Sequence, residues 1–287
     1  MKPYLRRELG KPIDQCFAHF HSKPIAAGSV GQVYGATHPQ GLKVAVKVLR
    51  PGIEAQVKED GRLLRKVAAL AASTSLGSQV DFVGLVDQVL AALERELDFR
   101  IEAENTRRLQ RCLQQSAFVP TGRLRLPQVV DDLSGQRVLA LEWIEGELIL
   151  APAARTSLEK GPAVQATTKA LLGAFVKQYF VEGFFHADPR PGNLKVLEDG
   201  SVILLDAGMV GVFDPRPRAN LLDLVLALIN QDAARATDLL EQIAPPAQGG
   251  KVDRQPLQRQ LDQLIASHWP TAVAMGLDQA GVRTNVC

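Results

Sequence analysis

Two short strings of polar residues, separated by a fixed interval, constrain this chain more than any other feature of its sequence. The first string is His186-Ala-Asp188-Pro-Arg-Pro-Gly-Asn193, and the second, Asp206-Ala-Gly208, begins thirteen positions after Asn193. Together they place two carboxylates and one carboxamide near one another along the chain. Oxygen donors of this kind suit Mg²⁺, and a carboxylate can also orient or deprotonate a hydroxyl group or a water molecule.

The order and spacing of these residues are typical of the catalytic loop and the metal-binding loop of the protein-kinase fold. On this interpretation Asp188 is the catalytic carboxylate and lies beside the attacking group. Asn193 and Asp206 are then the predicted ligands of the metal ion. We expect His186 to brace the loop through hydrogen bonds rather than to transfer protons.

A segment of small residues in the front half predicts a phosphate-binding loop. Small side chains let backbone N–H groups approach phosphate oxygens, and a valine after the loop can cover a purine ring. An ordinary hairpin that contains glycine is the alternative, because such loops are common. The residues assigned to nucleotide binding in this segment are Ala26, Ala27, Gly28, Ser29, Gly31 and Val33.

An apolar strand that ends in a lysine follows this loop. Val44-Ala45-Val46-Lys47 matches the Val-Ala-Ile-Lys pattern of kinases, in which the lysine reaches the α- and β-phosphates. Ala45 and Lys47 are therefore added to the predicted nucleotide site, and Lys47 also to the catalytic residues. The alternative is an edge-strand lysine that points into water, which is the commoner fate of lysine.

Residues 81 to about 115 have the spacing of one long amphipathic helix, because apolar side chains recur every three or four positions. Its first residue, an aspartate, is the predicted N-cap. Glu94, Asp98 and Glu102 stand four apart on one face, which is either a solvated stripe or the source of a carboxylate that holds the strand lysine. We predict that Glu102 is a catalytic-site residue and forms an ion pair with Lys47.

The segment Arg137 to Gly146 predicts a strand that runs into a connection between two lobes. In kinases the main chain of such a segment binds the edge of adenine. The predicted groups here are the carbonyl of Glu142 and the amide of Ile144. A strand followed by a glycine turn is also ordinary structure, so this interpretation depends on the position of the segment between the other motifs.

The remaining periodic segments are predicted to be structural. Residues 163–182 have helical spacing and end at Gly183, and 221–240 predict one or two amphipathic helices. Two apolar strings, 194–197 and 202–205, predict a β-hairpin that carries the metal ligands.

Composition excludes several classes of protein. Hydrophobic residues make up 46% of the 287 residues and charged residues 22%, which is typical of a folded globular protein. The net charge of +2 gives no reason to expect nucleic-acid binding. The three cysteines are far apart, and no secretory signal or membrane-spanning run is present, so we expect a cytoplasmic protein that contacts membranes at most peripherally.

The motifs together resemble one family, the UbiB/ADCK family of atypical kinase-like proteins, which includes the coenzyme Q biosynthesis kinases. The resemblance implies an α+β, bilobal protein-kinase-like fold. Residues 1–146 would form a β-rich front lobe with long family-specific helices, and 147–287 a helical rear lobe. The strings that carry the resemblance are Ala26 to Val33, Glu96-Leu-Asp98 with Glu102-Ala103 behind it, Glu142-Trp-Ile-Glu-Gly146, and His186 to Asn193.

The function that this resemblance implies is an ATP/Mg-dependent, atypical kinase-like ATPase of the phosphotransferase class, which supports ubiquinone or other isoprenoid-lipid metabolism. ATP or ADP and Mg²⁺ are the implied cofactors. Isoprenoid lipids and quinone-biosynthesis proteins are the implied partners. Phosphorylation of protein substrates is not expected.

The chain departs from the family pattern in several places. The inhibitory string Lys-x-Gly-Gln does not occur before Lys47, so two interpretations stay open: the chain is a fragment, as its C-terminal end also suggests, or it lacks this segment. Ala207 replaces the usual phenylalanine, and we expect a cavity beside it unless a neighbour fills the space. Lys195 stands where an apolar residue usually floors the adenine, and Arg190 replaces a histidine.

Two alternatives to an active ATPase remain at this point. Ala207 and Lys195 favour a nucleotide-binding pseudokinase that acts as a scaffold of a lipid-biosynthetic complex. A small-molecule phosphotransferase of the antibiotic-kinase type shares the two polar strings but explains neither the alanine-rich loop nor the acidic helix, so it ranks last.

Overall fold

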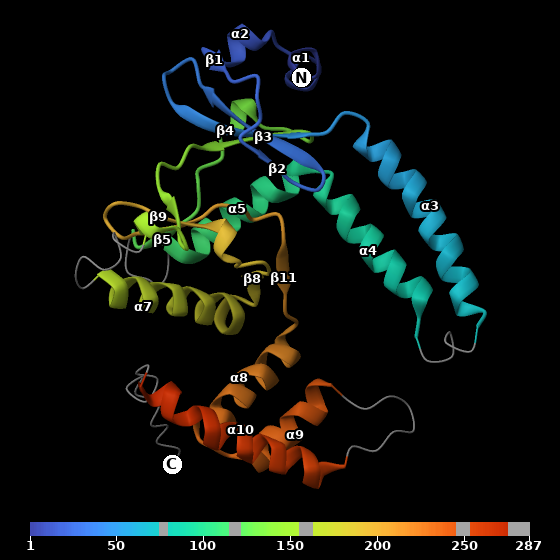
Figure 1. Cartoon of the computed structure of the whole chain (residues 1–287), viewed down its shortest axis with the longest axis vertical. Helices are drawn as coiled ribbons and strands as arrows, with labels where there is room; N and C mark the ends of the chain where they lie inside the picture. Colours follow the sequence, from blue (N-terminus) through green and yellow to red (C-terminus); the bar gives the residue numbers. More distant parts are fainter. Residues whose placement is uncertain (75–79, 115–121, 155–162, 245–252, 275–287) are drawn as a thin grey trace. The chain divides into compact units, whose positions relative to one another are not determined.

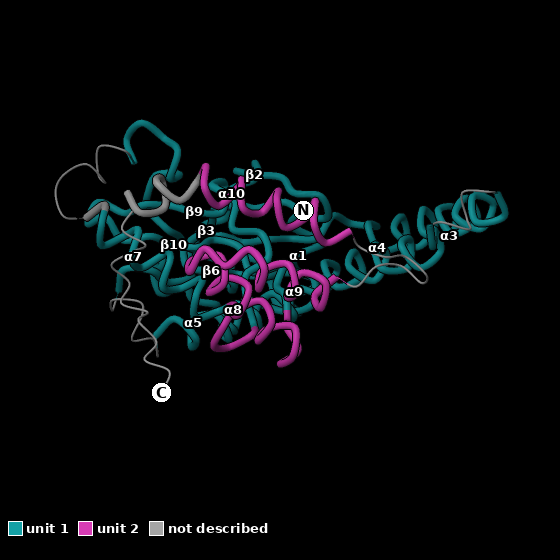
Figure 2. Tube along the Cα trace, turned by 90° about the horizontal axis from the view of Figure 1, so that it is seen from below, with its two compact units in different colours: residues 1–178, 184–211 teal, residues 179–183, 212–287 magenta. Residues whose placement is uncertain are grey.

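The computed structural model describes residues 1–74, 80–114, 122–154, 163–244 and 253–274. Its contacts divide the chain into two compact units, shown in teal and magenta in Figure 2. Unit 1 comprises residues 1–178 and 184–211, and unit 2 comprises residues 179–183 and 212–287. The predicted lobe boundary at residue 146 falls inside unit 1, and the division into lobes stays a prediction. The mixture of helices and sheets confirms the α+β class.

Unit 1 contains a five-stranded antiparallel sheet, which we call the front sheet (Figure 1). Its strands are β1 (His19–Phe20), β2 (Ala26–Ala27), β3 (Gly31–Thr37), β4 (Lys43–Leu49) and β6 (Val138–Glu142). They follow the order β1-β3-β4-β6, with β2 paired to β3. The central strands are rich in valine and alanine, as expected for strands that pack side chains on both faces.

Alternation along β4 decides which side chains reach each face of this sheet. Val44, Val46 and Val48 are at most 1% exposed and pack in a cluster with side chains from α1 (Lys2–Leu9) and α2 (Ile13–Cys16). The odd-numbered residues of β4, including Lys47, therefore point to the opposite face. The free thiol Cys16 is buried in the same cluster as the valines.

The predicted long helix after residue 80 is wrong, because it is broken in the middle. The structure has α4 (Phe82–Glu96) and α5 (Phe99–Gln114). Asp98 lies at the break between the two helices. Its Oδ1 accepts a hydrogen bond from the amide of Arg100, 3.0 Å away, and an N-cap residue starts a new helix through a contact of this kind. The predicted cap at Asp81 is confirmed, since its carboxylate accepts from the amide of Gly84 at 2.8 Å.

Helix α3 (Ile53–Ala72) lies beside α4 in the same unit (Figure 1). Gly61 makes this close approach possible, because a Cβ there would lie 3.0 Å from a methyl group of Leu90. An ion pair of 2.8 Å between Arg65 and Asp87 joins the two helices at their surface.

The rear part of unit 1 contains a second sheet and a helix. The predicted hairpin is present as β9 (Leu194–Val196) and β10 (Val202–Leu204), and the sheet follows the order β5-β10-β9-β7, with β5 (Leu124–Arg125) and β7 (Glu147–Leu148). The helix predicted over 163–182 is α7 (Ala163–Val176), continued by a π-helical turn (Lys177–Glu182), and Gly183 ends it with a φ of 63°. Strand β8 (Phe184–His186) pairs with β11 (Val210–Val212), and short 3₁₀ turns cover Asp131–Leu133 and Pro191–Asn193.

Unit 2 consists mainly of helices. The residues predicted to form one or two helices form two, α8 (Pro215–Ile229) and α9 (Ala233–Ile243), and α10 (Arg254–Ala274) packs on α9. Leu224, Ala236 and Leu239 lie at the centre of their apolar cluster. In the part of the chain that the structure describes, no helix combines the length and the apolar character needed to cross a bilayer.

We predict that replacing Asp98 by alanine lowers the free energy of unfolding by about 1 kcal/mol, because the first turn of α5 loses its cap. Asp98→Asn is the matched control, since asparagine caps equally well, and it should lose much less. Urea unfolding followed by circular dichroism measures both. If both variants lose the same free energy of unfolding, the loss comes from the carboxylate charge beside Arg100 rather than from the cap.

Candidate nucleotide-binding and catalytic site

A cleft of about 440 Å³ lies in unit 1. Its walls come from the loop at residues 26–33, the end of β4, the junction of α4 and α5, and the two polar strings of the rear part. These segments are far apart in the sequence, and all of them belong to the same compact unit.

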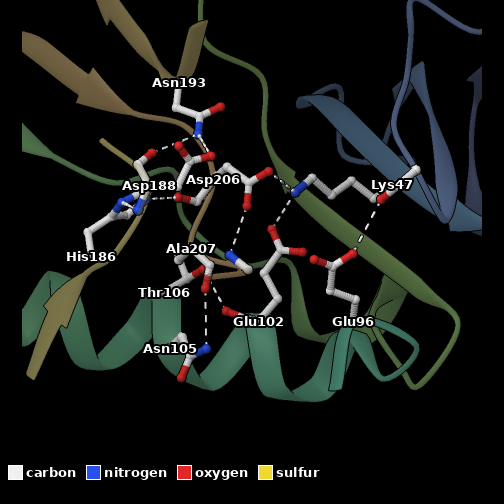
Figure 3. Close-up of polar contacts among 12 residues, drawn as sticks. Lys47, Glu96, Glu102, Asn105, Thr106, His186, Asp188, Asn193, Asp206 and Ala207 are labelled. Carbon is white, nitrogen blue, oxygen red and sulfur yellow. Dashed lines mark hydrogen bonds and ion pairs between the residues drawn. The ribbon is translucent and has the colours of Figure 1, made fainter. Parts of the chain in front are cut away.

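Lys47 lies at the centre of the polar contacts in this cleft (Figure 3). The predicted ion pair is formed: the Lys47 ammonium contacts a carboxylate oxygen of Glu102, which lies in the first turn of α5. The same ammonium lies 3.1 Å from Oδ2 of Asp206. The side chains of Lys47 and Glu102 are only 18% and 8% exposed, so water screens their interaction weakly.

The ionisation of these three groups follows from burial and from one another's charge. Burial alone would lower the pKa of Lys47, but the two carboxylates outweigh it and raise the pKa above its usual value. Burial raises the pKa of Glu102, and the charge of Asp206 adds to this against the opposing ammonium. For Asp206 burial is outweighed by Lys47 and by the amide of Gly208, so its pKa is lowered. Asp206 is thus the carboxylate that keeps its charge most firmly.

The catalytic loop is held in place by His186, which is 1% exposed. Its Nδ1 accepts a hydrogen bond from the amide of Asp188 at 3.1 Å, so the proton of the neutral ring belongs on Nε2. Nε2 then donates to the carbonyl of Asp206, and the ring links the two polar strings directly (Figure 3). The amide of His186 itself donates to Oε1 of the buried Gln178 at 2.9 Å. These contacts agree with the predicted bracing role.

Asp188 and Asn193 face each other at the two ends of the loop. The Asn193 side-chain amide donates to the Asp188 carbonyl at 3.1 Å and to its carboxylate at 3.3 Å. With the nitrogen engaged, Oδ1 is the atom of Asn193 that is available to a cation. Arg190 contacts the same oxygen of the Asp188 carboxylate, with its Nε 3.2 Å from Oδ2.

Helix α5 also supports the metal-binding loop. Asn105, one turn after Glu102, donates from Nδ2 to the carbonyl of Ala207 at 3.2 Å. Ala207 itself is 1% exposed and packs in an apolar cluster with Leu109 and Leu204. Neighbouring side chains therefore cover the position at which the sequence predicted a cavity.

The loop of small residues is a tight turn between β2 and β3. Ala26 pairs with Val33, and the amide of Gly28 donates to the carbonyl of Gly31 at 3.0 Å. Gly31 is required by space, because a Cβ there would lie 2.8 Å from the carbonyl oxygen of Val48. Strand β3 thus approaches β4 at the base of the turn.

Two contacts that the sequence did not predict hold the tip of this turn. Arg50, just after β4, donates from Nη2 to the carbonyl of Gly28 at 2.9 Å. The hydroxyl of Ser29 donates to the carboxylate of Glu96 at 3.3 Å, which connects the loop to the end of α4. Neither contact could be read from local spacing, since Ser29 and Glu96 are 67 residues apart.

The structure brings most of the predicted site residues together. The cleft is lined by Ala26, Ala27, Gly28, Ser29, Gly31, Val33, Lys47, Glu102, Asp188, Asn193 and Asp206. Ala45, Glu142 and Ile144 lie outside this lining, so their role in binding adenine stays a prediction. The Ile144 carbonyl, which was not one of the predicted adenine-binding groups, accepts a hydrogen bond of 3.0 Å from the ammonium of Lys195.

The oxygen donors in the cleft suit a metal ion whose remaining ligands come from a bound phosphate. Among the described residues, no group of three histidine, cysteine or acidic side chains is arranged to hold a metal ion alone. Asn193 and Asp206 offer two oxygen donors, which is the usual protein share of a magnesium site that phosphate oxygens and water complete.

Known proteins resemble this chain over most of its length. Residues 1–240 match the ABC1 atypical kinase-like domain. An uncharacterized protein of Synechocystis is 36% identical over 94% of this chain and 66% of its own length. The chloroplastic protein ACTIVITY OF BC1 COMPLEX KINASE 7 of Arabidopsis thaliana is 35% identical over 96% of this chain and 40% of its own length.

Similar coverage is found for an animal relative and for a solved structure. AarF domain-containing protein kinase 1 of Xenopus tropicalis is 32% identical over 79% of this chain and 43% of its own length. The structure of the complex of Rv3197 with erythromycin, from Mycobacterium tuberculosis, superposes with a TM-score of 0.66 and 25% identity over 92% of this chain and 65% of that chain. The chain thus spans less than two thirds of the length of these proteins.

The match to residues 1–240 covers well over half of the chain, and it includes both polar strings and the lysine strand. The predicted protein-kinase-like fold is confirmed by this match and by the superposition. The chain belongs to the ABC1 atypical kinase-like family, which is the UbiB/ADCK family that its motifs resemble.

Proposed function

We propose that the protein binds ATP or ADP together with Mg²⁺ in the cleft and acts as an atypical kinase-like ATPase that supports ubiquinone or other isoprenoid-lipid metabolism. The observation that carries the nucleotide assignment is the position of the Lys47 ammonium between Glu102 and Asp206. This arrangement fixes one cation in a cleft that the loop of small residues also lines, and small side chains let a phosphate approach the backbone closely.

The charge of the cleft supports a requirement for a divalent cation. Five carboxylates but only three basic side chains line it, the latter being Lys47, Arg95 and Arg190. A free triphosphate would be repelled by this excess of negative charge. Bound Mg²⁺ would supply the missing positive charge and polarise the phosphate oxygens, and Asn193 and Asp206 are the residues that would hold it.

Asp188 is the residue placed to act on the attacking group. Its carboxylate lies on the cleft wall and is oriented by Asn193 and Arg190. It would orient a water molecule or an alcohol toward the terminal phosphate and accept its proton. The lipid or quinone context of the reaction rests on family membership, since no residue described here selects such a substrate.

A pseudokinase scaffold is the second candidate, and the contact of Lys195 with the Ile144 carbonyl favours it. That ammonium lies at the segment expected to bind adenine. A charged group there weakens the apolar contact that a purine ring would otherwise make. Such a protein would bind nucleotide without turning it over.

We predict that Mg-ATP and Mg-ADP raise the thermal stability of the protein, and that chelating the metal removes most of the shift. A ligand at a hundred times its dissociation constant adds about 2.7 kcal/mol. Differential scanning fluorimetry with each nucleotide, with and without Mg²⁺, measures the effect. The absence of any shift would reject both the ATPase and the scaffold.

We predict that Asp188→Asn lowers the rate of phosphate release by about a hundredfold or more, because the base that orients the nucleophile is lost. Binding of ADP should change little. The exposed Asp60 on α3 provides the control variant Asp60→Asn, which should release phosphate at the normal rate. If the unmodified protein binds nucleotide but releases no phosphate, the scaffold becomes the better description.

We predict that Lys47→Met weakens binding of ATP much more than binding of adenosine, because only a phosphate contact is lost. The variant also leaves Glu102 buried without a partner, which costs about 3–5 kcal/mol of stability. The double variant Lys47→Met, Glu102→Gln should recover stability but not affinity for ATP. Titration calorimetry and urea unfolding separate the two effects, and recovery of ATP binding in the double variant would contradict the assigned role.

A further inference from the structure

A second cavity, of about 600 Å³, lies at one end of the front sheet of unit 1. We name it the sheet-end cavity, and it shares no lining residue with the cleft described above. The lining residues that matter for its chemistry are His21, Lys23, Ile25, Gly35, Lys43 and Trp143. No mechanism proposed for the cleft uses any of them.

Two aromatic rings border the same point of this cavity because residue 35 has no side chain. A Cβ on Gly35 would lie 3.2 Å from Cδ2 of His21 and 3.5 Å from Cζ3 of Trp143. Both rings therefore rest against the same point of β3. Their backbones are fixed to the sheet, since the amide of His21 donates to the Gly35 carbonyl at 3.0 Å and that of Trp143 to the Lys43 carbonyl at 3.1 Å. The rings thus form a wall on a rigid support.

An exposed apolar side chain adds to this aromatic wall. Ile25 is 54% exposed, although its amide is anchored to the carbonyl of Val33 at 2.8 Å. The ring of His19 packs edge-on against His21 with centroids 4.6 Å apart and limits the orientations of that ring. A planar apolar group that enters the cavity would meet surfaces that are already positioned, which reduces the entropy lost on binding.

The cavity also carries one sign of charge. Its lining contains Lys23 and Lys43 and no acidic residue. Lys43 forms an ion pair of 2.5 Å with Glu145, but the two side chains are 66% and 70% exposed. Exposed ion pairs of this kind add little to the free energy of folding. An anion inside the cavity can therefore replace Glu145 as the partner of the Lys43 ammonium.

We propose that the sheet-end cavity is a binding site for a planar aromatic carboxylate. The ring system would lie against His21 and Trp143, and the carboxylate would reach the ammonium groups of Lys23 and Lys43. Aromatic and cation contacts together distinguish such a molecule from a simple anion and from an uncharged ring. This site is separate from the nucleotide cleft, and its failure would leave the proposed function untouched.

The test measures binding of naphthalene-2-carboxylate to the full chain by titration calorimetry. Two comparison compounds separate the aromatic contact from the charge contact. Naphthalene-2-carboxamide has the aromatic rings without the charge. Cyclohexanecarboxylate has the charge without an aromatic ring. We expect the aromatic carboxylate to bind at least about fivefold more tightly than either, which is the size of one partly exposed charge contact.

Four variants locate the binding site. Lys23→Glu should weaken binding about fivefold, and Glu145→Gln should strengthen it, because Lys43 is released from its present partner. Gly35→Val should abolish binding by filling the space between the rings. Lys66→Glu, an identical charge change at an exposed position of α3, is the matched control and should have no effect.

Two results would overturn the proposal. Affinity that responds to neither Lys23→Glu nor Glu145→Gln would show that the probe binds elsewhere. Complete displacement of the probe by adenosine would place it in the nucleotide cleft. If Gly35→Val does not fold, Lys23→Glu and Glu145→Gln still decide between these outcomes.

Discussion

The sharing of one lysine by two carboxylates is the interaction on which the rest of the site depends. Lys47 comes from the front sheet, Glu102 from α5 and Asp206 from the metal-binding loop, so three separate segments meet at a single ammonium. Removing that charge would leave the buried carboxylate of Glu102 beside that of Asp206 with no cation between them. The β4 register, the close packing at Gly31 and the start of α5 all serve to bring these groups to one place.

Most of the architecture around the site could be predicted because it depends on short-range patterns. Alternation located β4, two apolar strings located β9 and β10, and helical spacing located α7, α8 and α9. The break between α4 and α5 could not be predicted in this way, because the apolar spacing continues across it. Asp98 stops the helix by bonding to the backbone ahead of it, and that contact leaves no trace in the periodicity. Glu102 was still identified, because it belongs to the acidic residues that recur every four positions from Glu94.

The same limit applies to the candidate site. The residues of the polar strings and of the small-residue loop line the cleft as their motifs predict, because each motif is a contiguous piece of chain. Arg50 and the contact of Ser29 with Glu96 were missed, since they join residues that are distant in sequence through a single hydrogen bond. The adenine-binding groups, the Glu142 carbonyl and the Ile144 amide, remain predictions, because neither residue lines the cleft. The contact of Lys195 with the Ile144 carbonyl was also missed, since no pattern reveals the path of that side chain.

Helix α5 touches both halves of the catalytic apparatus from adjacent turns. Glu102 holds the lysine, and Asn105, three residues later, holds the main chain of the metal-binding loop at Ala207. A rotation or withdrawal of this helix would therefore strain both contacts at once, because they share one rigid backbone. A change in the position of α5 would therefore reach the strand lysine and the loop around Ala207 together, without any contact being made inside the cleft.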